Sequence, residues 1–227
     1  MYKQLSNFYY GSVFSLLELQ EGKNFSFLGS AFICSNKGYL ATCAHNINIS
    51  KHDKLYIATI EHSINEFTPL TNQSVNAIKV SIVQFDSNSD VCLLKINNIT
   101  TNFHAPDNFL LKNRTLDVGS KCLYMGYPFG DFGFHKAKIS ATIISSKIIN
   151  KKGVKQYVLD TMVHSGNSGG PVIDIESGYI CGIISGRFNP MGRSGMFIGN
   201  YQVGSDTTIS KAIPIEYLIS LMNRENI

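Results

Sequence analysis

The stretch Gly166-Asn167-Ser168-Gly169-Gly170-Pro171 presents a single hydroxyl among glycines. Glycines let the backbone turn sharply, and they let a substrate carbonyl approach where side chains would block it. The same turn can point backbone N–H groups at one position, as acyl transfer requires for stabilising an oxyanion. Ser168 is therefore a candidate nucleophile, provided that a base lies nearby in space. The alternative is a glycine-rich β-turn with an incidental serine.

His45 is the candidate base, because it follows the apolar run Tyr39–Ala44 at a strand-to-loop edge. Rigid scaffolds often hold catalytic groups at such edges. The alternative for any single histidine is a core or capping role. The other histidines lack this setting and keep that interpretation: His52, His62, His104, His135 and His164. His164 lies close before Ser168, so it can line a substrate cleft without acting as the base.

Asp90 is the favoured orienting acid, because it opens the strongly apolar run Val91–Ile96. A carboxylate at the mouth of a buried strand can accept the imidazole N–H, set its tautomer and stabilise the imidazolium that forms. Taken alone, Asp90 is equally well a turn residue. Asp86 is the nearest rival, although it belongs to the polar turn 86–89. The other acids that stay open between His45 and Ser168 are Asp53, Glu61, Asp107, Asp131 and Asp160.

The composition is that of an ordinary globular protein, with 44% hydrophobic and 16% charged residues in a chain of 227. A β fold of this length often forms one structural unit. The formal charge of +4 is spread out, and the densest basic cluster, within 147–155, surrounds a turn at Gly153. Such a cluster is more typical of a solvated hairpin tip than of a nucleic-acid surface. We therefore expect no nucleic-acid partner.

Location and cofactors are predicted from what the chain lacks. No apolar run is long enough to cross a bilayer, and no secretory signal with a cleavage site is evident. The five cysteines are an odd number in apolar contexts and contain no CxxC pair, which favours buried free thiols in a reducing compartment. These observations predict a cytoplasmic protein with no membrane partner, no cofactor and no metal.

Short apolar runs separated by Gly, Asn, Asp and Ser clusters predict many strands, in a sandwich or a barrel. Asn36-Lys37-Gly38 is expected to turn a hairpin between Ala31–Ser35 and Tyr39–Cys43. The polar segment Ile99–Asp117 is the candidate linker between two halves. A closing amphipathic helix is predicted from Pro214 or Ile215 to about Arg224.

These residues make the chain similar to the trypsin-like (chymotrypsin-fold) serine peptidases, and within them to the HtrA/Deg-like bacterial branch. The order of the His, Asp and Ser segments matches this fold and not other serine-hydrolase scaffolds. The resemblance covers nearly the whole chain from about residue 10 and is carried by these motifs: Gly29–Ile33, Gly38–His45, Ser89–Ile96, Gly126–Gly130, Gly166–Pro171, Gly182–Ser185 and Ala212–Ile215.

The resemblance implies an all-β fold of two antiparallel β-barrels with a C-terminal α-helix. The N-terminal barrel would span about 8–103 and the C-terminal barrel with its helix about 115–227, so the linker becomes an inter-barrel crossing. Ser168 would be the nucleophile, His45 the general base and acid, and Asp90 the orienting carboxylate. The backbone N–H groups of Gly166 and Ser168 would form the oxyanion hole.

Departures from the family pattern also carry expectations. Digestive members have an aspartate before the serine that pairs with a freed N-terminus, whereas this chain has Asn167, so that route of zymogen activation is not expected. The HtrA-like branch usually continues into a PDZ domain after its closing helix. The chain stops there, so neither PDZ-driven regulation nor the trimeric assembly is carried over, and the oligomeric state stays open.

The resemblance places the base of the primary specificity pocket at Met162, beside Val163, with Ser185, Gly186 and Arg187 as the pocket wall. An apolar floor lacks a carboxylate for Lys or Arg, so cleavage after small or medium apolar residues is predicted unless Arg187 folds into the pocket.

The leading expectation is a serine endopeptidase acting on proteins or peptides. The alternatives are an inactive binding module of the same fold and a peptidase held in check until a regulatory protein partner orders its loops. The tract 186–204, rich in Gly and Asn, is the candidate loop for such control.

Overall fold

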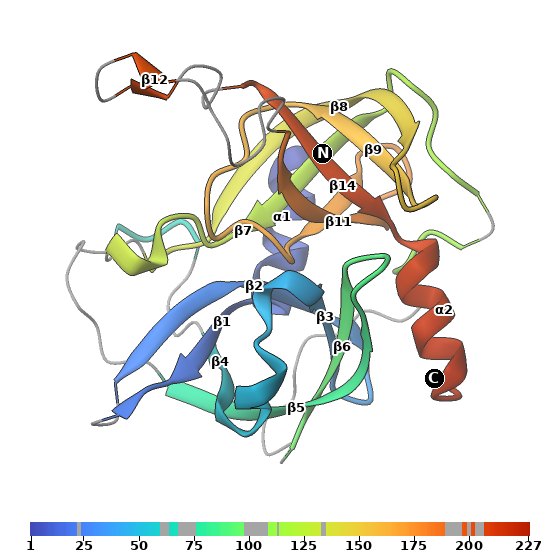
Figure 1. Ribbon diagram of the computed structural model, residues 1–227. Helices are drawn as coiled ribbons and strands as arrows, with labels where there is room; N and C mark the ends of the chain where they lie inside the picture. Colours follow the sequence, from blue (N-terminus) through green and yellow to red (C-terminus); the bar gives the residue numbers. More distant parts are fainter. Residues whose placement is uncertain are drawn as a thin grey trace.

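The structure is a computed structural model, and it describes residues 1–21, 24–59, 64–67, 76–97, 109–112, 114–132, 135–188, 197–198, 201–202 and 207–227. Within these residues the strands form two closed antiparallel barrels of six strands each, and a helix follows the second barrel (Figure 1). The predicted two-barrel fold with a C-terminal helix is confirmed.

The first barrel has the strand order β1-β2-β3-β6-β5-β4. Its strands are β1 Val13–Leu19, β2 Phe25–Ser35, β3 Tyr39–Cys43, β4 Leu55–Thr59, β5 Asn76–Asp86 and β6 Val91–Ile96. The turn between β2 and β3 is the predicted one, and its Gly38 has a φ of 77°, which glycine adopts without strain. In β6 every residue except Lys95 is buried, so the apolar run of the sequence became a central strand of the barrel.

The second barrel has the order β10-β11-β14-β9-β8-β7. Its strands are β7 Lys121–Gly126, β8 Lys138–Ile149, β9 Lys155–Asp160, β10 Pro171–Asp174, β11 Ile180–Arg187 and β14 Ile209–Pro214. The predicted basic hairpin tip lies between β8 and β9, where Gly153 has a φ of 78°. A short two-stranded sheet pairs β12 Phe197–Ile198 with β13 Tyr201–Gln202. The described 3₁₀ helices are η1 Tyr10–Ser12, η3 Ala44–Asn46, η4 Ile49–Lys54, which has a kink at Lys51, and η5 Gly130–Phe132.

Helix α1 adjoins the first barrel in the sequence but contacts the second, and helix α2 adjoins the second barrel in the sequence but contacts the first. Helix α1, Tyr2–Tyr9, precedes the first barrel, yet the Tyr9 hydroxyl donates to the Gly178 carbonyl of the second barrel at 2.7 Å. Helix α2, Glu216–Arg224, follows the second barrel, yet the Gln84 Nε2 of β5 donates to Glu225 Oε1 just beyond it at 2.5 Å. The two helices therefore join the barrels from opposite ends of the chain (Figure 1).

The two helices differ in how well the sequence predicts them. Helix α2 begins slightly later than expected, because Pro214 is the last residue of β14 and Ile215 precedes the first helical turn. Its apolar face, Leu218, Leu221 and Met222, is buried as the helical spacing predicts. Helix α1 was not predicted, since no side chain caps its start and the first turn holds no acidic residue.

The candidate linker Ile99–Asp117 is described only in part. Its described residues Phe109, Leu110 and Leu111 are buried, and the Leu111 N–H donates to the Ile180 carbonyl of β11 at 2.8 Å. This part is therefore attached to the second barrel and is not the exposed polar loop that was expected, because three adjacent apolar side chains pack there. Residues 98–108 and 113 lie outside the described residues, so the barrel boundaries stay a prediction.

All five cysteines are buried free thiols, as the sequence predicted: Cys34, Cys43, Cys92, Cys122 and Cys181. Burial raises the pKa of Cys92 to about 12 and holds the pKa of Cys181 well above its ordinary value. In the part of the chain that the structure describes, no helix is long and apolar enough to cross a membrane.

Candidate active site

His45 and Asp90 meet at the edge of the first barrel. His45 lies in η3, directly after β3, and Asp90 ends the turn between β5 and β6. The imidazole Nδ1 is 2.9 Å from both carboxylate oxygens of Asp90, and the backbone N–H of His45 donates to Asp90 Oδ1 at 2.9 Å. About half of the His45 side chain is exposed, and 25% of the Asp90 side chain. One carboxylate therefore orients both the ring and the backbone of the histidine, while the rest of the ring faces solvent.

A serine of the second barrel also binds Asp90. The Ser185 hydroxyl donates to Asp90 Oδ2 at 2.9 Å. Burial acts to raise the pKa of Asp90, but the hydrogen bonds and charge of His45 and the bond from Ser185 outweigh it, so the pKa lies below its ordinary value. The carboxylate is consequently ionised at neutral pH and can stabilise an imidazolium.

The glycine loop that carries Ser168 fits its place because it lacks side chains. Gly166 has a φ of 96°, and an added Cβ would lie 2.2 Å from the Tyr127 carbonyl oxygen. Gly169 has a φ of 90°, and an added Cβ would lie 2.0 Å from the Ser30 carbonyl oxygen. Both a left-handed backbone and a close approach to another chain segment therefore require glycine at these positions.

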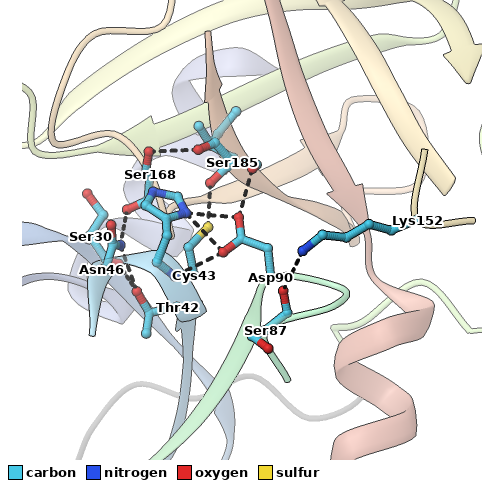
Figure 2. A network of polar contacts seen from close by, with 11 residues as sticks. Ser30, Thr42, Cys43, Asn46, Ser87, Asp90, Lys152, Ser168 and Ser185 are labelled. Carbon is cyan, nitrogen blue, oxygen red and sulfur yellow. Dashed lines mark hydrogen bonds and ion pairs between the residues drawn. The ribbon is translucent and has the colours of Figure 1, made fainter. Parts of the chain in front are cut away.

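Buried polar groups of the first barrel hold this loop in place (Figure 2). The Ser168 carbonyl accepts from the Ser30 N–H at 2.8 Å and from Asn46 Nδ2 at 2.9 Å. The Ser30 hydroxyl donates to the Gly166 carbonyl at 2.7 Å, and the Thr42 hydroxyl donates to the Ser30 carbonyl at 2.7 Å. Because Asn46 follows His45 in the chain, its bond to the Ser168 carbonyl holds the backbone of Ser168 beside the histidine. The sequence analysis missed these residues, although polar side chains inside apolar strand runs are the signal that could have found them.

The Ser168 hydroxyl does not face His45 in this arrangement. It donates to the Ser185 carbonyl at 2.9 Å, and none of the hydrogen bonds between described residues joins it to the imidazole. The backbone N–H groups of Gly166 and Ser168 donate to no group in the described part of the chain. Those two N–H groups are thus able to donate hydrogen bonds to a substrate atom. The Ser168 hydroxyl must rotate before it can transfer a proton to His45.

The side chain of Asn167, between Gly166 and Ser168, is buried without a hydrogen-bond partner among the described residues. Asn167 is fully buried, and neither its amide nitrogen nor its amide oxygen has a hydrogen-bond partner among the described residues. A charged aspartate at this position would need a cation, which the digestive members supply with a freed N-terminus. An uncharged amide avoids that requirement.

Of the predicted pocket residues, Ser185 and Gly186 lie next to Ser168. Val163 is buried and Met162 half-buried, while an added Cβ on Gly186 would lie 3.9 Å from the Ser168 hydroxyl. Arg187 Nε donates to the Val163 carbonyl at 3.3 Å, which joins the two predicted sides of the pocket. Ser185, expected only as pocket wall, also contacts Asp90. The remaining residues of the tract 186–204 that were expected to form a regulatory loop lie largely outside the described residues.

Two further candidates from the sequence, His164 and Asp86, make contacts other than those of a base or an orienting acid. The His164 ring lies 4.9 Å from the Phe129 ring, and burial together with the charges of Lys138 and Arg187 lowers the pKa of His164. It therefore favours the neutral form beside the loop. Asp86, the rival acid, does not contact His45 but accepts hydrogen bonds within its own turn.

The other rival acids do not reach the histidine where they are described. The side chains of Asp53 and Asp160 are exposed and have no recorded contact with His45. Glu61, Asp107 and the side chain of Asp131 lie outside the described residues.

One group of residues in the described part of the chain has the composition of a metal site. The ligand atoms of Cys43, His45 and Asp90 lie within 4.8 Å of one another. Two of these ligands are already bonded to each other, and the Cys43 thiol donates to the Ile184 carbonyl at 3.1 Å. Burial and the charge of Asp90 also raise the pKa of Cys43 well above its ordinary value, which opposes the thiolate that a metal needs. These residues do not fit a resident metal.

The structure thus brings the bonded pair His45 and Asp90 beside the loop of Ser168, where two β-barrels meet. A family model described as the trypsin-like peptidase domain matches residues 29–183, which is more than half of the chain. The chain therefore belongs to the trypsin-like peptidase family.

The relatives narrow the resemblance to the HtrA/Deg-like branch, as the sequence motifs predicted. The chain is 31% identical over 198 residues to a protein named probable periplasmic serine endoprotease DegP-like from Pseudomonas savastanoi pv. phaseolicola, covering 87% of this chain and 34% of that protein. A protein of the same name from Hahella chejuensis is 28% identical over 202 residues, covering 86% and 35%. The chain thus spans about a third of the length of these relatives.

The solved structures support the fold. A variant of the HtrA-type protease AlgW with a tripeptide superposes with a TM-score of 0.72 at 23% identity, covering 98% of this chain and 62% of that one. The serine endoprotease from Yersinia pestis gives a TM-score of 0.68 at 21% identity, covering 99% and 66%.

The prediction of a cytoplasmic location is wrong on this evidence, because the matched relatives are named periplasmic proteins. The odd number of cysteines had favoured a reducing compartment. All five thiols are buried, and burial raises the pKa of Cys34, Cys43, Cys92 and Cys181, so these thiols resist oxidation in any compartment. Free cysteines of this kind carry no information about location.

Proposed function

We propose that this protein is a serine endopeptidase that hydrolyses peptide bonds through an acyl-enzyme on Ser168. The observation that carries the proposal is the pair of His45 and Asp90, bonded at 2.9 Å and adjoining the glycine loop of Ser168. An ionised carboxylate behind the imidazole leaves the other ring nitrogen available to accept the proton of a nucleophile.

In the acylation step the Ser168 hydroxyl leaves the Ser185 carbonyl and turns towards His45. Its oxygen attacks the peptide carbonyl carbon as its proton passes to the free imidazole nitrogen. Asp90 stabilises the imidazolium, and the N–H groups of Gly166 and Ser168 donate to the oxyanion. The C–N bond then breaks, and the imidazolium gives its proton to the leaving amine.

In the deacylation step a water molecule replaces the amine. His45 removes a proton from the water as its oxygen attacks the ester carbon, and the returned proton restores the Ser168 hydroxyl when the acid leaves. Every proton therefore passes through one imidazole, whose orientation depends on Asp90.

An active-site serine probe tests the assignment. A fluorophosphonate should label the wild-type protein at Ser168, as located by mass spectrometry of the labelled peptide. Ser168→Ala should not be labelled, and Ser220→Ala provides a control, because Ser220 is an exposed serine of α2 whose hydroxyl donates to the Glu216 carbonyl. Labelling that survives Ser168→Ala would refute the assignment of the nucleophile.

A second candidate function is a peptidase that a protein partner must activate. It is favoured by the Ser168 hydroxyl, which donates to the Ser185 carbonyl instead of to His45. In that case the probe would label the protein only after addition of cell lysate or substrate peptide. Labelling of the purified protein alone, at the same rate with and without lysate, would exclude gating.

We further propose a preference for small or medium apolar residues at the position before the scissile bond. Support comes from the apolar Met162 and Val163, and from Arg187, whose Nε is bonded to the Val163 carbonyl. A peptide library varied at this position should show highest turnover with Ala, Val or Leu. A strong preference for Lys or Arg would contradict the proposal, and a preference for Asp or Glu would show that Arg187 sets the charge of the pocket.

A further inference from the structure

Two turns of this molecule are built in the same way, and one of them carries Asp90. The first turn, 87–90, joins β5 to β6, and the second turn, 175–178, joins β10 to β11. Each follows an aspartate that ends a strand, and each has a serine three positions after that aspartate, giving Asp86-x-x-Ser89 and Asp174-x-x-Ser177.

In the first turn Asp86 accepts three hydrogen bonds. Its Oδ1 accepts from the N–H of Asn88 at 2.9 Å and from the N–H of Ser89 at 3.3 Å, and its Oδ2 accepts from the Ser89 hydroxyl at 2.6 Å. Burial acts to raise the pKa of Asp86, but these bonds and the charge of Arg224 lower it on balance. The carboxylate therefore stays ionised and acts as a strong acceptor for its own turn.

In the second turn Asp174 makes the matching set of bonds. Its Oδ1 accepts from the N–H of Glu176 at 3.4 Å, and its Oδ2 accepts from the N–H of Ser177 at 3.1 Å and from the Ser177 hydroxyl at 2.5 Å. Asp174 also lies 3.5 Å from Arg114. The second turn thus has at least as many contacts to its aspartate as the first.

The last residue of each turn has a left-handed backbone. In the second turn this residue is Gly178, with a φ of 75°. In the first turn it is Asp90, with a φ of 62°, a conformation that residues other than glycine disfavour. Aspartate tolerates it better than most residues do, and the contacts of Asp86 directly before it hold the turn in that shape.

We propose that Asp86 is a positioning residue for the catalytic reaction, because it holds the turn that places the Asp90 carboxylate against His45. The inference rests on the proposed function of Asp90. The groups that face the turn from other elements fit this role: Ser185 donates to Asp90 from β11, and Lys152 Nζ lies 3.5 Å from the Ser87 carbonyl (Figure 2). Arg224 of α2 acts on Asp86 only through its charge.

The test compares Asp86→Ala with Asp174→Ala, which removes the same bonds from a turn that lacks a catalytic residue. Hydrolysis of a fluorogenic peptide gives kcat and KM, and circular dichroism establishes folding. Asp86→Ala should lower kcat at least tenfold with KM within twofold of wild type, because the site keeps its pocket and loses its oriented base. It should also move the acid limb of the kcat/KM profile to lower pH, since a displaced Asp90 stabilises the imidazolium less. Asp174→Ala should lower thermal stability and leave kcat and the pH profile unchanged.

Asp86→Asn covers the case in which Asp86→Ala does not fold. One carboxamide oxygen can still accept from the N–H groups of Asn88 and Ser89, so this variant should recover part of kcat and stay below wild type. Equal loss of kcat in Asp86→Ala and Asp174→Ala, or an unchanged kcat and pH profile in a folded Asp86 variant, would overturn the inference.

A wild-type protein that neither hydrolyses peptides nor reacts with the serine probe would instead contradict the proposed function. Positioning would then be read from the downfield NMR signal of the imidazole N–H that faces Asp90. The signal should weaken in Asp86→Ala and persist in Asp174→Ala. A signal that is identical in both variants would overturn the inference without reference to activity.

Discussion

The first and second turns share one set of bonds and differ in the residue at their end. A left-handed backbone disfavours an L-residue other than glycine by about 1–2 kcal/mol, and the second turn avoids this with Gly178. The first turn has Asp90 in the same conformation. Asp90 binds His45 and Ser185 with its carboxylate, whereas Gly178 has no side chain and offers only its carbonyl to Tyr9. The comparison fits the proposed role of Asp90, because the less favoured residue stands where its carboxylate binds the histidine.

The two turns also differ in the elements that contact them. The second barrel contacts the first turn through Ser185, so the Asp90 carboxylate is bonded from both barrels. The second turn is contacted by α1, where Leu5 and Tyr9 pack against Gly178. The first turn thus lies at the junction of the barrels, and the second turn supports the terminal helix.

Apart from replacement of Asp90 itself, the largest effect among the tests of this comparison is expected for Ser185→Ala. It removes the second donor to Asp90, and hydrogen bonds to charged groups are worth about 1.5–3 kcal/mol. We expect kcat/KM for a fluorogenic peptide to fall by about 10- to 150-fold, since each 1.36 kcal/mol is a factor of ten. The matched control is Ser177→Ala, which removes the hydroxyl bonded to Asp174. Equal kcat/KM values in the two variants would break the distinction between the turns.

A smaller effect on stability alone is expected for Gly178→Ala. Alanine at a φ of 75° is strained, and the added Cβ would lie 3.4 Å from Leu5. The free energy of unfolding, measured in urea, should fall by about 1–2 kcal/mol with kcat/KM unchanged. Gly11→Ala is the control, because nothing lies within 4 Å of its added Cβ and its φ is not in the left-handed region, so little change is expected. A fall in kcat/KM would mean that the second turn also serves the reaction.

The smallest effect concerns pH. The pKa of Asp90 is lower in the folded protein than its ordinary value near 4, so its ionisation stabilises the fold above about pH 4. That contribution should be lost as pH falls through the lower folded value. The stability difference between wild type and Asp90→Asn should therefore shrink between pH 7 and pH 3 in urea unfolding. Asp117→Asn, at a side chain that is 96% exposed, should show a much smaller change. A difference that stays constant with pH would contradict the depressed pKa.

The sequence predicted those parts of the site that short segments determine. His45 and Asp90 lie where apolar strands meet turns, and Ser168 lies among glycines, so their types and neighbours made them candidates, and the resemblance to the family selected them. The bonds that bring the segments together were not predictable in this way. Ser30 and Asn46 contact the Ser168 loop across more than a hundred residues of chain, and a local pattern does not contain that pairing.

The other differences also have causes that no local sequence pattern contains. Ser185 was expected at the pocket wall, and its bond to Asp90 depends on how β11 of one barrel faces the turn of the other. The rotamer of Ser168, which points its hydroxyl to the Ser185 carbonyl, is a choice among staggered states that no sequence pattern encodes. Helix α1 lacks the usual start signals, and Tyr9, its one buried residue, anchors it through tertiary contacts.

The central claim is that the left-handed position of the first turn serves catalysis while that of the second turn serves structure. The most direct test is kcat/KM for the pair Asp90→Asn and Gly178→Asn, which places the same residue at both positions. Asparagine tolerates the left-handed backbone, so both variants should fold. Asp90→Asn should lower kcat/KM by about 10⁴-fold, because the neutral amide favours the wrong imidazole tautomer, and Gly178→Asn should stay within about twofold of wild type. Comparable activities for the two variants would contradict the claim.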